Sequence, residues 1–220
     1  MPKVYTADSN ATAELPKVYE PSDEPQSLAY LDEVKSDTFA EKDIDMKPSL
    51  PPLFNKTYES LRKDYNLSFV YENVFIPTLR RIGALWSSGE LFPAQEHFLS
   101  NLIKQKFYHA IEAVDSPVRK NKKAYLFLPP WEDHDFALLY SHMILKENGF
   151  DIVNVGKTIS FESILQCIEK IKPDILFTTF IVGQKVTLLQ KFCDDLHNHS
   201  NTKLFFAGNP DLLRLVNTHG

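Results

Sequence analysis

Residues 124–140 have the sequence AYLFLPPWEDHDFALLY, and this stretch decides the fold class. Its first five residues are all apolar and Pro129 follows them, which is typical of a short buried strand. Residues 131–135 contain a tryptophan, three acidic residues and one histidine, so this part predicts a polar loop. Apolar residues at helical spacing begin at Phe136 and continue to about Asn148. The stretch therefore predicts a strand, a loop and a helix in succession.

The same order of strand and helix repeats along the rest of the chain. Further apolar strands are expected at 152–155, 175–180 and 203–207, separated by helices at 162–170 and 186–196. Such alternation predicts an α/β fold with a parallel sheet covered by helices on both faces. Ligands bind such sheets beyond the carboxyl ends of the strands. The site is therefore expected among the loops at 129–135, 156–160, 178–183 and 207–210.

The residues before this alternation are predicted to be helical. Apolar side chains recur at helical spacing over 53–65, 68–86 and 93–114. We expect Ser68 to cap the second of these helices and Pro77 to kink or divide it. Three helices with short loops predict a small bundle, in which the third helix buries apolar residues that include Phe98 and Phe107.

These patterns divide the chain into a disordered acidic leader at 1–50, a helical bundle at 51–115 and an α/β domain at 121–220. A polar, basic linker at 116–123 joins the last two parts. The leader holds five basic residues, 11 acidic residues and five prolines, with no sustained apolar period. Such a composition buries too little apolar surface to offset its ordering entropy. One short helix near 26–35 is the element we expect in it.

The composition also excludes several classes of protein. A net charge of −5, from 24 basic and 29 acidic residues, argues against a free-standing nucleic-acid binder. No run of apolar residues is long enough to span a membrane, and the N-terminus lacks the pattern of a secretory signal. Cys167 and Cys193 show neither a redox-motif nor a metal-ligand spacing. We therefore expect reduced thiols in a cytoplasmic protein.

The loop after the first predicted strand carries the most chemically capable residues. His134 is flanked there by Glu132, Asp133 and Asp135. Such an imidazole could be a metal ligand whose tautomer a neighbouring carboxylate fixes, or a general base that a carboxylate orients. A solvated acidic loop whose histidine has no role explains these residues equally well.

A second candidate cluster lies at the corner between the second and third predicted helices, where Trp86 is followed by Glu96 and His97. A tryptophan at a helix end more often closes a bundle core than meets a ligand. A histidine at a helix start is more often exposed or bonded to the backbone. Taken singly, each of these residues is better explained by structure than by ligand binding.

Two motifs in these clusters resemble those of known proteins. The segment Glu132-x-His134-x-x-Ala137 is similar to the acid-x-His-x-x-Gly signature of corrinoid proteins, with alanine in place of the closing glycine. The segment Trp86-x9-Glu96-His97 resembles the signature of MerR-type light-sensing transcriptional regulators of the CarH and LitR type. The resemblance covers about residues 51–210.

This resemblance implies a helical bundle that caps a flavodoxin-like, Rossmann-like α/β domain with cobalamin between them. His134 would be the lower axial ligand of cobalt, held by Glu132. Trp86 and Glu96 would surround the upper adenosyl group of adenosylcobalamin, and His97 would take the vacated position after light breaks the cobalt–carbon bond. Other cofactor contacts implied by the resemblance are Ser160, Thr179 and Gly208.

The resemblance also implies a regulator and not an enzyme. We expect a homo-oligomer formed through the bundle, and DNA binding only through a separate domain. The chain ends before the fifth strand and last helix of the fold, so we expect either a sheet that is short at one edge or a fragment. Two alternatives stay open. One is a corrinoid shuttle protein of a methyltransferase system, and the other is a degenerate domain that no longer binds cobalamin.

Overall fold

The computed structural model describes residues 5–6, 46, 48–115, 119–200 and 202–215. Within these ranges the chain forms two compact units, with the boundary between Ala110 and Ile111. The first unit is helical, and the second is an α/β unit that also includes residues 5–6. The expected helix near 26–35 and most of the expected leader lie outside the described residues.

The helical unit consists of three principal helices, α2 (Leu50–Asp64), α4 (Ile76–Ser87) and α5 (Pro93–Ala113). A single helical turn, α3 (Leu67–Val70), and a π-helical turn (Tyr71–Phe75) precede α4. Apolar side chains from all of these elements form its core: Phe54, Leu61, Leu67, Val70, Val74, Phe75, Ile82, Leu99, Ile103 and Phe107. The third helix therefore buries Leu99 and Ile103 together with the expected Phe107, whereas Phe98 is only half-buried.

The segment from 66 to 87 differs in detail from the predicted single helix. Asn66, and not Ser68, is the N-cap, and its side-chain oxygen accepts a hydrogen bond from the amide of Phe69 at 2.8 Å. The α-helix widens to a π-helical turn immediately before Pro77. A proline ring clashes with the carbonyl group four residues earlier, and the wider turn accommodates it. The helix is therefore not divided at Pro77 but changes its type next to it, between Phe75 and Ile76.

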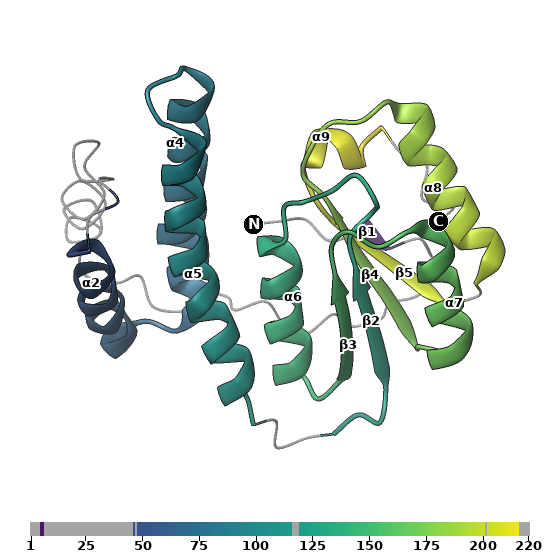
Figure 1. The fold of residues 1–220 in the computed structure, drawn as a ribbon. Helices are drawn as coiled ribbons and strands as arrows, with labels where there is room; N and C mark the ends of the chain where they lie inside the picture. The colour runs from purple at the N-terminus through teal and green to yellow at the C-terminus, as the bar shows by residue number, and fades with distance from the viewer. Residues whose placement is uncertain (1–4, 7–45, 47, 116–118, 201, 216–220) are drawn as a thin grey trace. The chain divides into compact units, whose positions relative to one another are not determined.

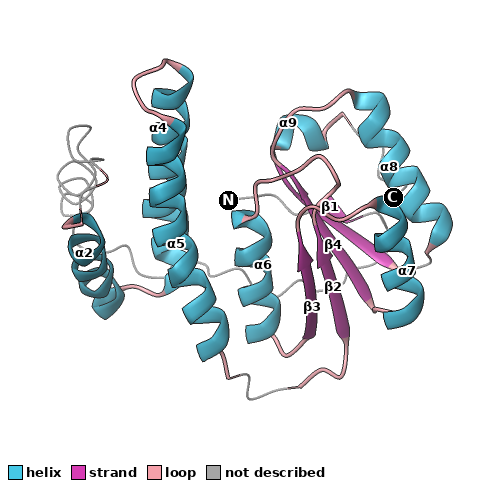
Figure 2. Cartoon of the chain, viewed as in Figure 1, coloured by secondary structure: helices cyan, strands magenta, loops and turns pink. Residues whose placement is uncertain are grey.

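The α/β unit contains the predicted alternation of strands and helices (Figure 2). Its parallel strands are β2 (Lys123–Phe127), β3 (Asp151–Gly156), β4 (Ile175–Phe180) and β5 (Lys203–Gly208). The helices that follow them are α6 (Phe136–Glu147), α7 (Phe161–Ile171), α8 (Val186–His199) and the short α9 (Pro210–Leu213). The parallel strands are arranged in the order β5-β4-β2-β3. This order reverses between β2 and β4, which makes the carboxyl end of β2 a topological switch point.

Each face of the sheet has its own apolar core because successive side chains of a strand point to opposite sides. Tyr125 and Phe127 of β2 pack with α7 and α8, around Phe192. Leu126 and Leu128 belong to the other face, which packs against α6 (Figure 1). Burying each such side chain contributes on the order of 2 kcal/mol. Cys193 is buried in the first of these cores and Cys167 packs against it, and both are free thiols.

A short strand from the N-terminal part of the chain completes the sheet. β1 (Tyr5–Thr6) pairs antiparallel with β5, so that Tyr5 lies opposite Phe206 and Thr6 opposite Phe205. No strand was predicted here, because a two-residue strand is too short to have a periodicity in the sequence. β5 is therefore covered on both edges within the described part of the chain.

Candidate functional site

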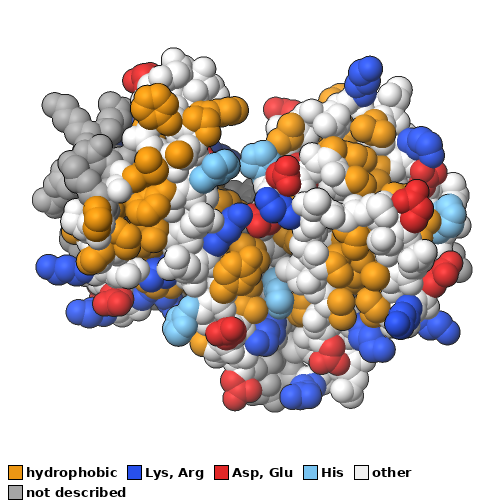
Figure 3. Space-filling view, in the orientation of Figure 1, with side chains coloured by type: hydrophobic (Ala, Val, Ile, Leu, Met, Phe, Trp, Pro, Cys, Tyr) orange, Lys and Arg blue, Asp and Glu red, His pale blue; other side chains and the backbone are white. Residues whose placement is uncertain are grey.

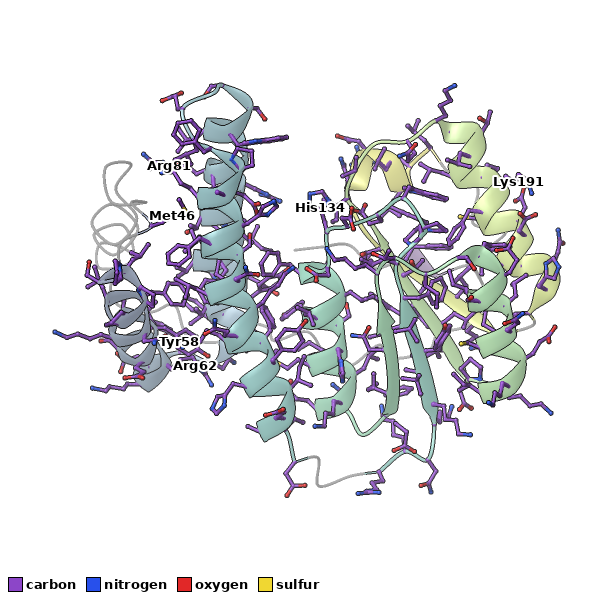
Figure 4. All side chains as sticks on the ribbon, viewed as in Figure 1. Met46, Tyr58, Arg62, Arg81, His134 and Lys191 are labelled. Atoms are coloured by element: carbon purple, nitrogen blue, oxygen red, sulfur yellow. The ribbon has the colours of Figure 1, made fainter. Side chains whose placement is uncertain are left out.

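The carboxyl ends of β2 and β4 bring together two loops that are far apart in the sequence. The loop from β2 to α6 contains Glu132 and His134, and the loop from β4 to α8 begins at Ile181. Figure 4 shows the labelled His134 at this end of the sheet. The loops meet at the switch point, where such folds bind ligands.

Glu132 connects the two loops through its side chain, which is buried although the residue is charged (1% exposed). Its Oε1 accepts hydrogen bonds from Nδ1 of His134 at 2.7 Å and from the backbone amide of His134 at 2.9 Å. Its Oε2 accepts from the amides of Ile181 at 2.7 Å and Val182 at 3.0 Å. All four donors converge on one carboxylate, so it fixes both the loop and the imidazole.

These hydrogen bonds keep Glu132 ionised. Burial by itself raises the pKa of this carboxyl group. The hydrogen bonds from His134, Val182 and Ile181 together outweigh burial and lower the pKa to about 2. A carboxylate can only accept, so Nδ1 of His134 must carry the proton that it donates. In the neutral imidazole the lone pair is then on Nε2.

The His134 imidazole has the arrangement that a metal ligand needs. Its side chain is 57% exposed, while the carboxylate that orients it is fully covered. The two neighbouring acids are placed differently. Asp133 is largely exposed, and its Oδ1 lies 3.5 Å from Nζ of Lys157. The side chain of Asp135 does not cap α6. An oriented neutral imidazole can bind a metal or act as a general base. The buried carboxylate is not a feature of a solvated acidic loop.

The ends of β4 and β5 hold two further candidates from the sequence. Thr179 is completely buried, and its hydroxyl has no hydrogen-bond partner among the described residues. Gly208, which pairs with Phe180, has φ +137°, and a Cβ atom there would lie 2.0 Å from the Phe180 carbonyl oxygen. Ser160 lies in the next loop, where it caps α7 by accepting from the amide of Ser163 at 3.2 Å.

Replacing Gly208 by alanine should lower the free energy of unfolding by roughly 3 kcal/mol, because strain at the positive φ adds to a backbone overlap. Denaturant unfolding measures this change. Gly183 provides a matched control, since a Cβ there would have its nearest neighbour, a Leu212 methyl carbon, at 3.9 Å. Gly183→Ala should change stability by less than about 0.5 kcal/mol. Equal stability of the two variants would contradict the close approach of β5 to Phe180.

The helical unit holds the remaining candidates at the corner between α4 and α5. The amide of Leu91 donates to the Leu85 carbonyl at 3.2 Å, which places the start of α5 beside the end of α4. Trp86 is 52% exposed and therefore does not close the bundle core. Large apolar side chains are exposed on the helical unit, and those on the viewed face appear in orange in Figure 3.

Glu96 and His97 repeat the chemistry of Glu132 and His134. Oε2 of Glu96 contacts Nδ1 of His97 at 2.8 Å, and its Oε1 accepts a hydrogen bond from Ser100. The His97 side chain is 74% exposed. This second carboxylate also engages Nδ1 of its histidine, which leaves Nε2 as the nitrogen directed away from the carboxylate.

Sequence reasoning missed one aromatic residue at the same corner. Phe92 is 72% exposed and precedes Pro93, the first residue of α5. Polar residues such as serine or asparagine are preferred at this N-cap position. Here Gln95 supplies part of the cap, and its side-chain oxygen accepts from the Phe92 amide at 2.9 Å. The signal in the sequence was an aromatic residue at a position that favours a polar one.

The structure thus groups Trp86, Glu96 and His97 within the helical unit, and Glu132 and His134 within the α/β unit. Thr179 and Gly208 lie on neighbouring strands at the same end of the sheet. No three histidine, cysteine or acidic side chains among the described residues are arranged to hold a metal ion. In the same ranges, no helix combines the length and hydrophobicity that crossing a membrane requires.

Comparison with known proteins supports one interpretation of these clusters. Residues 53–111 match the family described as the B12 binding domain. Over 106 residues the chain is 26% identical to the HTH-type transcriptional repressor CarH of Myxococcus xanthus. These two matches support a similarity to the cobalamin-binding region of CarH-type regulators. The match covers 48% of this chain and 35% of that repressor, so the chain spans about a third of its relative's length.

Solved structures add evidence on the fold. The monomethylamine corrinoid protein of Methanosarcina barkeri has a TM-score of 0.54 and 17% identity, over 78% of this chain and 77% of that one. A cobalamin-binding protein from Desulfitobacterium hafniense DCB-2 has 16% identity and a TM-score of 0.38, over 83% and 88%. The first likeness confirms the predicted α/β fold with a parallel, Rossmann-like sheet. The similarity to CarH-type regulators rests on the sequence matches.

Proposed function

We propose that this chain is the cobalamin-binding part of an adenosylcobalamin-dependent, light-responsive regulator, with His134 as the lower cobalt ligand. The observation that carries this proposal is the buried Glu132 carboxylate at 2.7 Å from Nδ1 of His134. A metal-bound histidine almost always donates the N–H of its other ring nitrogen to a carboxylate, a backbone carbonyl or water. The similarity to the B12 binding domain and to CarH supports cobalamin as the cofactor that this imidazole would meet.

The described residues fit the cofactor in two respects. A single imidazole suffices as a ligand because a corrin ring supplies four nitrogen atoms to its own cobalt. The Thr179 hydroxyl is buried without a partner on the α6 face of the sheet, next to Ala207 on β5. A buried hydroxyl favours a hydrogen-bonding group, which the nucleotide tail of cobalamin carries. Ser160 and Gly208 would border the same end of the sheet.

The helical unit would act on the upper face of the cofactor. Adenosylcobalamin supplies a cobalt–carbon bond that light breaks. Trp86 would cover the adenosyl group with an aromatic surface that is already exposed. Glu96 would orient His97, so that its Nε2 becomes available once the adenosyl group has left. Residues 51–115 would form this cap, residues 121–220 the cobalamin domain and residues 1–50 a leader without a part in the site.

The output of such a regulator would be assembly. Displacement of the cap would change any homo-oligomer built through the helical unit, and DNA would be bound by a separate domain. The cobalt–carbon bond would then decide between two positions of the helical unit, as a switch requires. The chain itself would catalyse no reaction.

A spectroscopic titration tests this function. The full chain is mixed with adenosylcobalamin in the dark, freed of excess cofactor, and its absorbance is recorded before and after green light. We expect the spectrum of cobalamin with histidine below the cobalt, followed after light by that of a second imidazole above it. His97→Ala should photolyse without acquiring the second imidazole, which separates the regulator from a corrinoid shuttle. Absence of any retained cofactor would leave the degenerate domain as the explanation.

A further inference from the structure

The loop from β2 to α6 has its largest side chain at Trp131. The carbonyl oxygen of Pro129 accepts a hydrogen bond from the Glu132 amide at 3.0 Å, so residues 129–132 form a turn. Proline is favoured as the second residue of such a turn, and Pro130 occupies that position. The next residue, Trp131, packs against the apolar core between the sheet and the helices α7 and α8 (Figure 2).

The Trp131 indole meets the aromatic ring of Phe192 on α8. The ring centroids are 5.1 Å apart and the ring planes are inclined by 73°, an edge-on arrangement that aromatic pairs favour. Phe192 also contacts Phe127 and Phe180, the last residues of β2 and β4, with centroids at 6.5 and 6.1 Å. Phe161 at the start of α7 is a fourth neighbour, at 5.5 Å. The sheet and α7 therefore fix the ring on which the loop rests.

The chain before α8 contacts the same loop at a second point. The amides of Ile181 and Val182 donate to the carboxylate of Glu132. Because Glu132 directly follows Trp131, a polar contact and an aromatic contact hold adjacent positions of the loop. Hydrogen bonds weaken steeply outside a narrow range of distance and angle, so those that Glu132 accepts require a fixed relation between the two loops. The contact with Phe192 supplies this relation from the apolar side.

We propose that Trp131 is a positioning residue for His134. Its contact with Phe192 holds the loop in the place where the Glu132 carboxylate meets both the imidazole and the amides of the next loop. This inference rests on the proposed function, in which His134 binds cobalt. It assigns the effect to the aromatic ring of Trp131 and not to its Nε1, which is buried without a hydrogen-bond partner among the described residues.

Amide hydrogen exchange of the full chain without cofactor tests the proposal independently of cobalamin binding. Trp131→Leu removes the ring contact and keeps an apolar side chain. It should accelerate exchange of the Ile181 and Val182 amides by at least about tenfold, relative to the Leu126 amide in the interior strand β2. Trp131→Phe keeps a ring and removes the unpaired N–H. Its exchange should therefore stay within about threefold of that of the wild-type chain.

Phe161→Leu is the matched control, because Phe161 is also partly buried and contacts the same Phe192 ring from α7. It should leave exchange of the two amides unchanged relative to β2. Equal acceleration by Phe161→Leu or by Trp131→Phe would overturn the proposal, and so would wild-type exchange in Trp131→Leu. If Trp131→Leu does not fold, Trp131→Met fills the same space with a flexible side chain and gives the same comparison.

Absorbance titration with adenosylcobalamin in the dark measures the effect on cobalt ligation. Loss of a group that orients a metal-bound histidine typically weakens metal binding by about 10–100-fold. Trp131→Leu should therefore weaken cofactor binding by at least about tenfold, and Trp131→Phe and Phe161→Leu by less than about threefold. Undiminished binding by Trp131→Leu would overturn the proposal. If the wild-type chain retains no cofactor, the proposed function fails, and the exchange experiment still decides whether Trp131 positions the loop.

Discussion

His134→Ala should abolish the spectrum of histidine-ligated cobalamin and weaken cofactor binding by at least about 100-fold. Loss of an outer partner of a metal-bound histidine typically weakens metal binding by 10–100-fold, and loss of the ligand itself has a larger effect. The side chain is 57% exposed, so its removal should leave the fold intact. Absorbance titration with adenosylcobalamin in the dark measures both changes.

Two further measurements make this result specific. Free imidazole added to His134→Ala should restore the ligated spectrum, because it can occupy the vacated position below the cobalt. His199→Ala is the control, since His199 is exposed at the end of α8, just before the amino end of β5. An unchanged spectrum in His134→Ala would remove this residue from the cobalt.

Glu132→Gln should destabilise the unligated protein by about 2–4 kcal/mol. The carboxylate accepts from four donors, two on each oxygen. A glutamine has one oxygen and one NH2 group, so one pair of these donors must lose its acceptor in a buried place. Denaturant unfolding measures the loss. Glu169→Gln, at an exposed position of α7, is the matched control and should change stability by less than about 0.5 kcal/mol.

The same substitution should also alter the response to acid. The pKa of Glu132 is lowered from 4.5 to about 2, so the folded state binds this proton less readily than the unfolded chain. Its contribution, on the order of 3 kcal/mol, is present above pH 4.5 and is lost as the pH falls from 4.5 toward 2. The wild-type chain should therefore lose this part of its free energy of unfolding between pH 4.5 and 2, and the Glu132→Gln variant should not. Parallel acid-unfolding curves for the two proteins would contradict the lowered pKa.

The arrangement of the site explains why these effects are large. Glu132 joins the β2–α6 loop to backbone amides 49 and 50 residues later. The orientation of the His134 imidazole therefore depends on the loop after β4, although His134 itself lies in the loop after β2. A substitution at Glu132 should change both the stability of the sheet end and the cofactor spectrum. One at His134 should abolish the ligated spectrum and have a smaller effect on stability, because it removes only one of the four donors to Glu132.

The sequence by itself determined the order and type of the elements. Strands that are buried on both faces appear as short apolar runs, and the predicted strand at 175–180 coincides with β4. Local backbone signals also sufficed at Pro93, which begins α5, and they pointed to an irregularity at Pro77, next to which the helix changes its type. His134 was recognisable because its motif is contained within six consecutive residues.

The motif resemblance pointed to Glu132 as the acid that supports His134, but only the tertiary structure gives the physical reason. By residue type alone, Glu132, Asp133 and Asp135 could each orient the imidazole. They differ in the structure because the amides of Ile181 and Val182 cover Glu132 alone. The requirement for glycine at 208 comes from the Phe180 backbone on the adjacent strand. The exposure of Trp86 and the pairing of β1 with β5 likewise depend on packing between distant segments, which no local pattern encodes.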